Sequence, residues 1–308
     1  MLCRWSLVQF RKMSIRAALI DLSGTLHVED EPTPDAVVAL QRLRSSGIIV
    51  KFVTNTTKDS KATLYERLVK IGFQLEAAEI YSSLSAAVAF VSNEKLNPFY
   101  LLTNDARKDF PEEDQSRPHD AVVVGLAPNA FDYEHMNKAF NVLLQNKTHK
   151  LVAVHQGKYY KRADGLALGP GCFVKGLEYA TGSTATLIGK PNSYFFQSAL
   201  PDGLRAEECV MIGDDANDDI AGAMQVGLQG ILVKTGKFLP DALAAISPPP
   251  TAVVKNFAEA VDWILCKKQA VVLLQLNWCR HFNKCSGNLY NRKLHYNSWV
   301  EILAQIPG

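Results

Sequence analysis

Short apolar segments alternate with amphipathic helices along most of the chain, and this alternation constrains the fold more than any other feature. Residues 16–21 form an apolar run that ends in an acid, Pro34 to Ser46 carries apolar residues at helical spacing, and Ile48 to Val53 is rich in β-branched residues. The same order returns in residues 208–225. Such alternation predicts a mostly parallel sheet with helices on both faces. The expected fold class is therefore α/β, with a doubly wound core.

A second set of strands and helices interrupts this pattern between residues 83 and 185. Three further apolar runs and a helix from Tyr133 to Leu144 are enough for an α/β domain of its own, inserted into the first. A last helix, Phe257 to Leu265, is expected to complete the core. The expected organisation is a core of residues 16–82 and 186–265, an inserted cap domain of residues 83–185, a flexible leader over 1–15 and a poorly ordered tail over 266–308.

The composition excludes several classes of protein. Hydrophobic residues make up 47% and charged residues 21% of the 308, which is ordinary for a globular chain. A net charge of +2 gives no reason to expect a nucleic-acid partner, and no run approaches the roughly 18 apolar residues of a membrane-spanning helix. The six cysteines follow no disulfide or zinc spacing, which favours reduced thiols and a cytoplasmic location. The acid-free start is similar to a mitochondrial presequence, but it is short, so a loose leader is the preferred interpretation.

Four polar motifs each follow a predicted strand. They are Asp21-Leu-Ser-Gly-Thr25, Thr54-Asn-Thr-Thr57, Leu187-Ile-Gly-Lys-Pro191 and the acidic run from Gly213 to Asp219. Because ligands of open parallel sheets bind beyond the carboxyl ends of the strands, we expect the four motifs to meet. Taken singly, each has an ordinary explanation as a turn, a helix cap, a surface lysine or an acidic turn. Their shared placement favours a functional site.

The residue types in these motifs suit phosphoryl chemistry. Asp21 ends a buried strand, and Gly24 lets backbone amides approach an anion. Hydroxyls and free amides at the start of a helix, as expected for Thr54–Thr57, suit a phosphate, and the compact charge of Lys190 can neutralise one. Four carboxylates within residues 214–219 are costly without a counter-cation. Oxygen ligands of this kind favour Mg²⁺.

In this order, the motifs resemble those of the haloacid dehalogenase (HAD) superfamily, whose members are mostly Mg²⁺-dependent phosphatases. The resemblance covers residues 16–265, and the insert is similar to the larger α/β cap of the 4-nitrophenylphosphatase-like branch. The chain also resembles one smaller group of proteins within that branch. This narrower resemblance rests on Ser23 and on the stretches 53–57 and 159–171. The resemblance implies that Asp21 is the nucleophile that forms an aspartyl-phosphate, and that the insert is a lid. The metal ligands that the resemblance implies are Asp21, the Ser23 carbonyl, Asp214 and Asp219, with Asp215 as an alternative to Asp219 in orienting the metal shell. The phosphate-binding residues that it implies are Ser23, Thr54, Asn55 and Lys190. Lys190 is also expected to assist catalysis.

The cap stretch from His155 to Arg162 carries aromatic and basic residues. These residues could face the phosphate site, or they could form a solvated pair of strands. His155 itself is expected to have a structural role.

Ser23 departs from the superfamily's usual pattern, in which an Asp at this position protonates the leaving group and later activates water. Losing a general acid costs about 10²–10⁴ in rate. We therefore expect weak activity on alkyl phosphates and better activity on activated donors such as pyrophosphate or phosphoramidates. The alternative is a catalytically weak protein with a binding or regulatory role. The expected partner is a small phosphorylated substrate or pyrophosphate, with a homodimer as a further expectation and no nucleic-acid or membrane partner.

Overall fold

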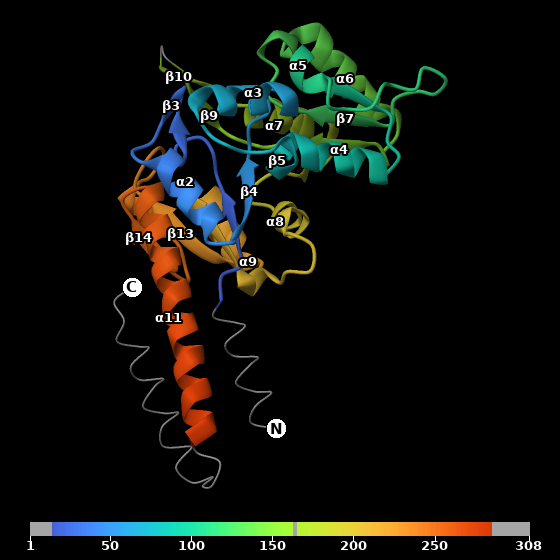
Figure 1. Cartoon of the computed structure of the whole chain (residues 1–308). Helices are drawn as coiled ribbons and strands as arrows, with labels where there is room; N and C mark the ends of the chain where they lie inside the picture. Colours follow the sequence, from blue (N-terminus) through green and yellow to red (C-terminus); the bar gives the residue numbers. More distant parts are fainter. Residues whose placement is uncertain (1–13, 163–164, 285–308) are drawn as a thin grey trace.

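The computed structural model describes residues 14–162 and 165–284, so most of the predicted leader and the end of the predicted tail lie outside the described residues (Figure 1). Within those ranges the chain forms a six-stranded sheet, a four-stranded sheet and two short hairpins. The predicted doubly wound core with an inserted second α/β unit is confirmed.

The core sheet is parallel throughout and has the order β14-β13-β12-β1-β4-β5. From β1 the chain builds the sheet outward through β4 and β5, and it later returns to the other side of β1 with β12. The strand order therefore reverses between β1 and β12, and ligands of doubly wound sheets bind at this kind of switch point. The strands are β1 Ala17–Ile20, β4 Ile49–Thr54, β5 Ile80–Ser82, β12 Cys209–Gly213, β13 Gln229–Val233 and β14 Ala252–Val254.

Helices cover both faces of this sheet because successive side chains of each strand point to opposite sides. Ala18 and Ile20 of β1 pack into a cluster with helices α2 (Ala36–Ser45), α3 (Lys61–Ile71) and α11 (Phe257–Lys284). Ala17 and Leu19 pack on the other face. The elements on that second face are α4 (Ser83–Asn93), α8 (Ser193–Ala199), the π-helix η4 (Ala216–Ala221), α9 (Gly222–Gln225) and α10 (Pro240–Ala244).

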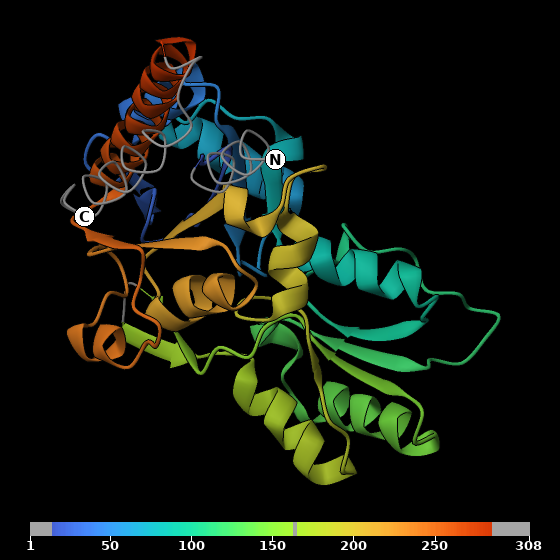
Figure 2. The same ribbon diagram turned by 90° about the horizontal axis from the view of Figure 1, so that it is seen from below.

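The inserted cap has its own parallel sheet with the order β11-β8-β7-β6. Helices α6 (Tyr133–Gln145) and α7 (Gly171–Thr181) cover its outer face, as Figure 2 shows. Val123 and Val152 on the inner face share an apolar cluster with α4 and with Leu19 of the core sheet. Cap and core therefore meet through a continuous hydrophobic layer. The cap strands are β6 Pro98–Leu101, β7 Ala121–Val124, β8 Lys150–Ala153 and β11 Thr186–Leu187.

The structure differs from the predicted organisation at four places. Helix α4 (Ser83–Asn93), assigned to the cap, packs against α8 on a face of the core sheet. Ile15, assigned to the leader, is buried in the core directly before β1. Strand β11, assigned to the core, pairs with β8 of the cap. Helix α11 continues past Leu265, its predicted end, to Lys284. The extension has a simple cause, because no Gly or Pro occurs between Leu265 and Lys284 to end the helix.

The remaining elements are short. They are β2 His27–Val28 paired with β3 Glu31–Pro32, β9 Tyr159–Arg162 paired with β10 Gly165–Leu168, the helix α5 Asn104–Arg107, and the 3₁₀ turns η1 Ala77–Glu79, η2 Pro128–Ala130 and η3 Ala206–Glu208. Among the helices of the described ranges, none combines the length and the apolar character needed to cross a membrane.

Candidate active site

Asp21 lies at the switch point of the core sheet, directly after the buried strand β1. Its backbone N–H donates to the carbonyl oxygen of Ile212 in β12 at 2.9 Å, which ties the two central strands together where they end. The residue is only 5% exposed. Thr25 Oγ1 lies 3.5 Å from Asp21 Oδ2, at the limit of a hydrogen bond. The carboxylate is thus held at the predicted edge of the sheet.

Lys190 lies between two buried carboxylates. Its Nζ is 2.6 Å from Asp21 Oδ1 and 2.6 Å from Asp219 Oδ1, and the Lys190 side chain is 3% exposed. Burial alone would lower the pKa of Lys190, but the charges of Asp21 and Asp219 raise it above its usual range. The ammonium is therefore protonated at every physiological pH.

Asn55 fixes the loop that carries Lys190. The Asn55 Nδ2 donates to the Lys190 carbonyl oxygen, and the Lys190 N–H donates to Asn55 Oδ1, both at 3.0 Å. The structure therefore uses the Asn55 side chain to position the lysine. The prediction assigned Asn55 to phosphate binding, and that assignment stays a prediction.

Three buried carboxylates form a compact cluster. Asp21, Asp214 and Asp219 each offer an oxygen, and these oxygens all lie within 4.8 Å of one another. Burial, together with the charge of Asp21, raises the pKa of Asp214 to about 7. Burial also raises the pKa of Asp219. The cluster has an excess of buried negative charge over the single ammonium of Lys190, so an oxygen-liganded divalent cation fits it.

The three carboxylates differ in how many hydrogen bonds their oxygens already accept from the protein. Asp219 Oδ1 accepts from Lys190, and Asp219 Oδ2 accepts the backbone N–H of Asp215 at 3.1 Å. Asp214 Oδ2 accepts the backbone N–H of Lys237 at 2.6 Å. Asp215, the predicted alternative in the metal shell, lies outside the cluster and caps η4 by accepting the N–H groups of Asn217 and Asp218.

Two glycines make room for Asp214. Gly24 has φ +94° and Gly236 has φ +54°, in the left-handed region that side chains rarely occupy. A Cβ on Gly24 would lie 2.1 Å from Asp214 Oδ2, and one on Gly236 would lie 2.0 Å from the same atom. The Thr235 hydroxyl donates to the Gly24 carbonyl oxygen at 2.5 Å and joins the two loops. Asp214 is therefore enclosed by backbone on two sides.

The loop after β4 is built differently from the prediction. Thr54 is buried, and its Oγ1 accepts the backbone N–H of Thr56 at 3.1 Å. Helix α3 begins only at Lys61, with Ser60 as its N-cap, so Thr54 ends β4 and residues 55–57 lie in the loop before the helix. The sequence pattern placed the helix too early because Ser60 is the residue whose hydroxyl accepts from the Thr63 N–H.

Thr57 connects this loop to the cap. Its Oγ1 accepts the Leu126 N–H at 3.2 Å and lies 3.2 Å from His155 Nε2. The His155 Nδ1 accepts the Gly157 N–H at 3.1 Å, so Nε2 carries the ring proton and donates to Thr57. Burial, together with the charge of Lys237, lowers the pKa of His155 to about 4. A neutral histidine that links two segments agrees with the structural role expected for it.

Two further residues concern this site: Ser23, which the sequence placed in it, and Lys237, which the sequence prediction did not include. Ser23 is exposed, and its backbone pairs with His27 in an isolated bridge. Lys237, which the sequence analysis missed, lies between Gly236 and Phe238 in the loop after β13, with its Nζ 3.8 Å from Asp215 Oδ2. A signal was available, because Lys234-Thr-Gly-Lys237 is a fifth polar stretch that follows a predicted strand.

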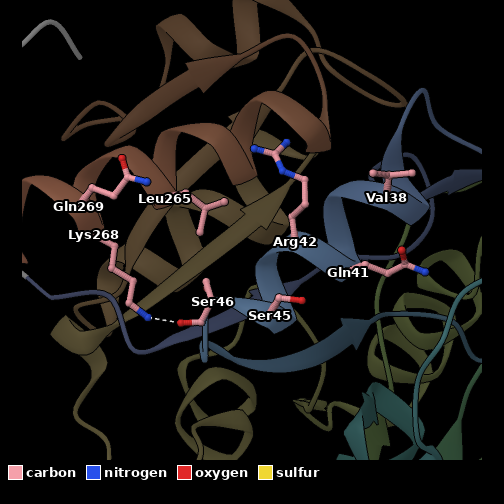
Figure 3. Close-up of a pocket in the computed structure, with 8 residues that line it drawn as sticks. All are labelled: Val38, Gln41, Arg42, Ser45, Ser46, Leu265, Lys268 and Gln269. Atoms are coloured by element: carbon pink, nitrogen blue, oxygen red, sulfur yellow. Dashed lines mark hydrogen bonds between the residues drawn. The ribbon is translucent and has the colours of Figure 1, made fainter.

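A groove of about 910 Å³ lies elsewhere, between α2 and α11 (Figure 3). Lys268 of α11 donates to the Ser46 carbonyl oxygen at its edge. The groove contains none of the carboxylates, and it lies on the α2 and α11 face of the core. It therefore has no part in the chemistry of the cluster.

The fold and the carboxylate cluster define a doubly wound α/β protein with an acidic site at the carboxyl ends of its strands, and comparisons with known proteins identify the family. Residues 18–116 match the family model of haloacid dehalogenase-like hydrolases, and residues 187–260 match a second, HAD-hydrolase-like model. The chain belongs to the haloacid dehalogenase-like hydrolases, as predicted.

Two groups of relatives cover most of the chain. It is 49% identical to human haloacid dehalogenase-like hydrolase domain-containing protein 2 over 82% of this chain and 96% of the relative. It is 36% identical to human phospholysine phosphohistidine inorganic pyrophosphate phosphatase over 83% of this chain and 96% of that protein. These identities confirm the narrower resemblance carried by Ser23 and the stretches 53–57 and 159–171.

Solved structures agree on the fold. The 4-nitrophenylphosphatase of Thermotoga maritima superposes with a TM-score of 0.75 at 23% identity, over 82% of this chain and 98% of that chain. The glycerol phosphate phosphatase of Mycobacterium tuberculosis, solved in complex with magnesium, gives a TM-score of 0.70 at 25% identity, over 79% of this chain and 76% of that chain.

Proposed function

We propose that this protein is a Mg²⁺-dependent phosphohydrolase in which Asp21 attacks the phosphorus and carries the phosphoryl group as an aspartyl-phosphate. The observation that supports this proposal best is the buried Lys190 ammonium, 2.6 Å from both Asp21 and Asp219. A carboxylate whose charge is partly offset is still nucleophilic, and the same ammonium can accept the charge of an incoming phosphoryl oxygen.

We propose that Asp21 and Asp214 hold the Mg²⁺, with the Ser23 carbonyl and Asp219 completing the protein's share of ligands. Asp219 lies within reach of the same ion, although its oxygens already accept from Lys190 and from the Asp215 N–H. When bound, the ion supplies positive charge to the phosphoryl oxygens. All its proposed ligands are oxygens, which suits Mg²⁺.

The chain's own residues then divide the remaining work. Lys190 neutralises the phosphoryl group beside Asp21, and Asn55 holds the Lys190 backbone. We assign the hydroxyls of Thr54 and Ser23 and the backbone at Asn55 to the phosphoryl oxygens. Because this chemistry is mainly positioning and electrostatics, a rigid cluster of this kind suits it.

Ser23 limits the substrates that such a site can use. A serine hydroxyl does not protonate a leaving group at neutral pH, so an alkyl phosphate, which needs that proton, is a poor substrate. Pyrophosphate and phosphoramidates carry better leaving groups. The second candidate function, a catalytically weak protein with a binding or regulatory role, is favoured by this same Ser23.

Two features bear on location and assembly. Cys172, Cys209 and Cys266 are free thiols in the described part of the chain, which supports a cytoplasmic protein. Tyr133 on α6 and Tyr179 on α7 are 79% and 94% exposed on the outer helices of the cap, and we propose a homodimer through this face. Light scattering tests this, since a monomer at micromolar concentration contradicts the dimer.

The experiment is phosphate release from pyrophosphate, acetyl phosphate, a phosphoramidate and a sugar phosphate, with Mg²⁺ or with EDTA. Asp21→Asn removes the nucleophile, and Asp202→Asn, an exposed aspartate after α8, is the matched control. The proposal expects turnover of the activated donors that requires Mg²⁺ and Asp21 and is retained in Asp202→Asn. Turnover that survives in Asp21→Asn contradicts the proposed nucleophile. No turnover, with phosphate still bound, supports the binding or regulatory role.

A further inference from the structure

Lys237 places a second ammonium beside the carboxylate cluster. Its backbone N–H donates to Asp214 Oδ2 at 2.6 Å, so the residue is anchored to the site by its main chain. Its Nζ is 3.8 Å from Asp215 Oδ2, and the side chain is 68% exposed. The main chain of Lys237 is thus fixed, while its ammonium is held loosely and is open to solvent.

The two lysines of the site are in opposite situations. Lys190 is 3% exposed and contacts two buried carboxylates at 2.6 Å, so its charge is already balanced within the protein. Among the residues that the structure describes, Lys237 has one ion-pair partner, Asp215, at the longer distance of 3.8 Å. An exposed ammonium with one weak partner can exchange that partner for a ligand at low cost, because a surface ion pair contributes little.

Lys237 lies in the loop that closes over Asp214. A Cβ on its neighbour Gly236 would lie 2.0 Å from Asp214 Oδ2, and the Lys237 N–H donates to the same oxygen. Burial lowers the pKa of His155 in the cap, and the charge of Lys237 lowers it further. The charge of Lys237 therefore lies beside the core site and acts on a residue of the cap.

We propose that Lys237 binds the leaving group of the substrate, and that this leaving group is anionic, so that the preferred substrate class is a phosphoanhydride such as pyrophosphate. This inference rests on the proposed function and narrows it. In a phosphoramidate the bridging nitrogen is protonated before the P–N bond breaks, so the amine leaves uncharged and offers Lys237 no negative charge to offset.

The step balances without any further reactant. Asp21 Oδ forms a bond to one phosphorus of the pyrophosphate trianion, and the bond from that phosphorus to the bridging oxygen breaks. The electron pair stays on the bridging oxygen, and the second phosphate, which already carries the proton, leaves as a dianion. Lys237 offsets the charge that develops on that oxygen. An ammonium in this position replaces part of the function that a proton from an Asp at position 23 would supply.

The test compares Lys237→Gln with Lys234→Gln, an exposed lysine three residues earlier in the same loop. Losing one donor to a developing oxyanion in a buried site costs about 10²–10³ in rate. Because Lys237 is exposed and screened by salt, we expect kcat/KM for pyrophosphate to fall by about 10- to 100-fold in Lys237→Gln. The loss should be at least about tenfold larger than the loss on a phosphoramidate, whose amine leaves uncharged, while 4-nitrophenyl phosphate, which leaves as a phenolate, should show an intermediate loss. Lys234→Gln should match the wild type on all three.

An equal loss on all three substrates, or no loss on pyrophosphate, overturns the inference. A binding measurement separates this failure from a failure of the proposed function. Methylenediphosphonate, which is not hydrolysed, should bind Lys237→Gln about tenfold more weakly than wild type in calorimetry with Mg²⁺, while orthophosphate should show a smaller change. If the wild type hydrolyses nothing and this binding difference is present, the proposed function fails, and Lys237 stands only as a binding site for the second phosphate. If the difference is absent, the site fails.

Discussion

Replacing Lys190 with methionine tests whether the buried ammonium stabilises the carboxylate cluster. The substitution keeps an unbranched apolar side chain in place and removes only the charge. Asp21 and Asp219 then lose a partner at 2.6 Å, in a place where their side chains are 7% and 2% exposed. Two buried carboxylates would be left without the cation that balances them.

The expected cost follows from this geometry. Removing one partner of a buried ion pair costs about 3–5 kcal/mol because the remaining charge is uncompensated. Asp214, with its pKa raised to about 7, and Asp219, with a raised pKa, can take up a proton and reduce the repulsion. We therefore expect the lower end, a loss of about 3 kcal/mol in the free energy of unfolding, or about 6–12 °C in Tm.

Urea unfolding at pH 7 in EDTA is the assay, with Lys234→Met as the control for loss of an exposed lysine. Adding Asp219→Asn to Lys190→Met removes one of the orphaned charges and should recover part of the loss, because coupled residues are not additive. A loss of less than about 1 kcal/mol in Lys190→Met, or additive effects of the two substitutions, would refute the reasoning.

Three further predictions follow from the site and the core. Ser23→Asp restores a carboxylate at an exposed position and should raise kcat/KM for alkyl phosphates by about 10²–10⁴; an unchanged rate in a steady-state assay means that a general acid is not what the site lacks. Mg²⁺ at about 100 times its Kd should add about 2.7 kcal/mol to the unfolding free energy of wild type, with a smaller gain in Asp214→Asn, and equal thermal shifts would contradict Asp214 as a ligand. Glu79 accepts two hydrogen bonds from Arg44, at 2.7 and 2.5 Å; Glu79→Gln removes the negative charge and one of the two acceptor oxygens and should cost about 1 kcal/mol at pH 7. Burial acts to raise the pKa of Glu79, but the Arg44 hydrogen bond lowers it below 4.5, so this stabilisation is present above that pH and lost as the pH falls through the lowered pKa; a wild-type to variant difference that does not shrink on acidification would be inconsistent with this.

The sequence was most informative where a strand ends in a polar motif. Asp21, Lys190, Asp214 and Asp219 could be selected because each follows an apolar segment, and parallel strands bring their carboxyl ends to one edge. The structure brings these four side chains together at distances that no spacing in the sequence encodes.

Other features could not be predicted because they depend on contacts between distant segments. The Asn55 side chain reaches the Lys190 backbone across 135 positions of the chain, and Thr57 contacts Leu126 and His155 in the cap. Strand β11 looked like core because it directly precedes the Lys190 motif, and only its pairing with β8 assigns it to the cap. The stretch 234–237 follows a predicted strand, but only the fold shows that the Lys237 N–H donates to Asp214.

Trapping the phosphoryl group on Asp21 tests the central claim most directly. The protein would be mixed with Mg²⁺ and labelled pyrophosphate, quenched in acid during turnover, and digested for mapping by mass spectrometry. The account predicts one phosphoryl group on the peptide that contains Asp21, released by hydroxylamine as expected for an acyl phosphate, and absent from Asp21→Asn. Turnover with no label on this peptide, or with the label on another residue, would contradict it.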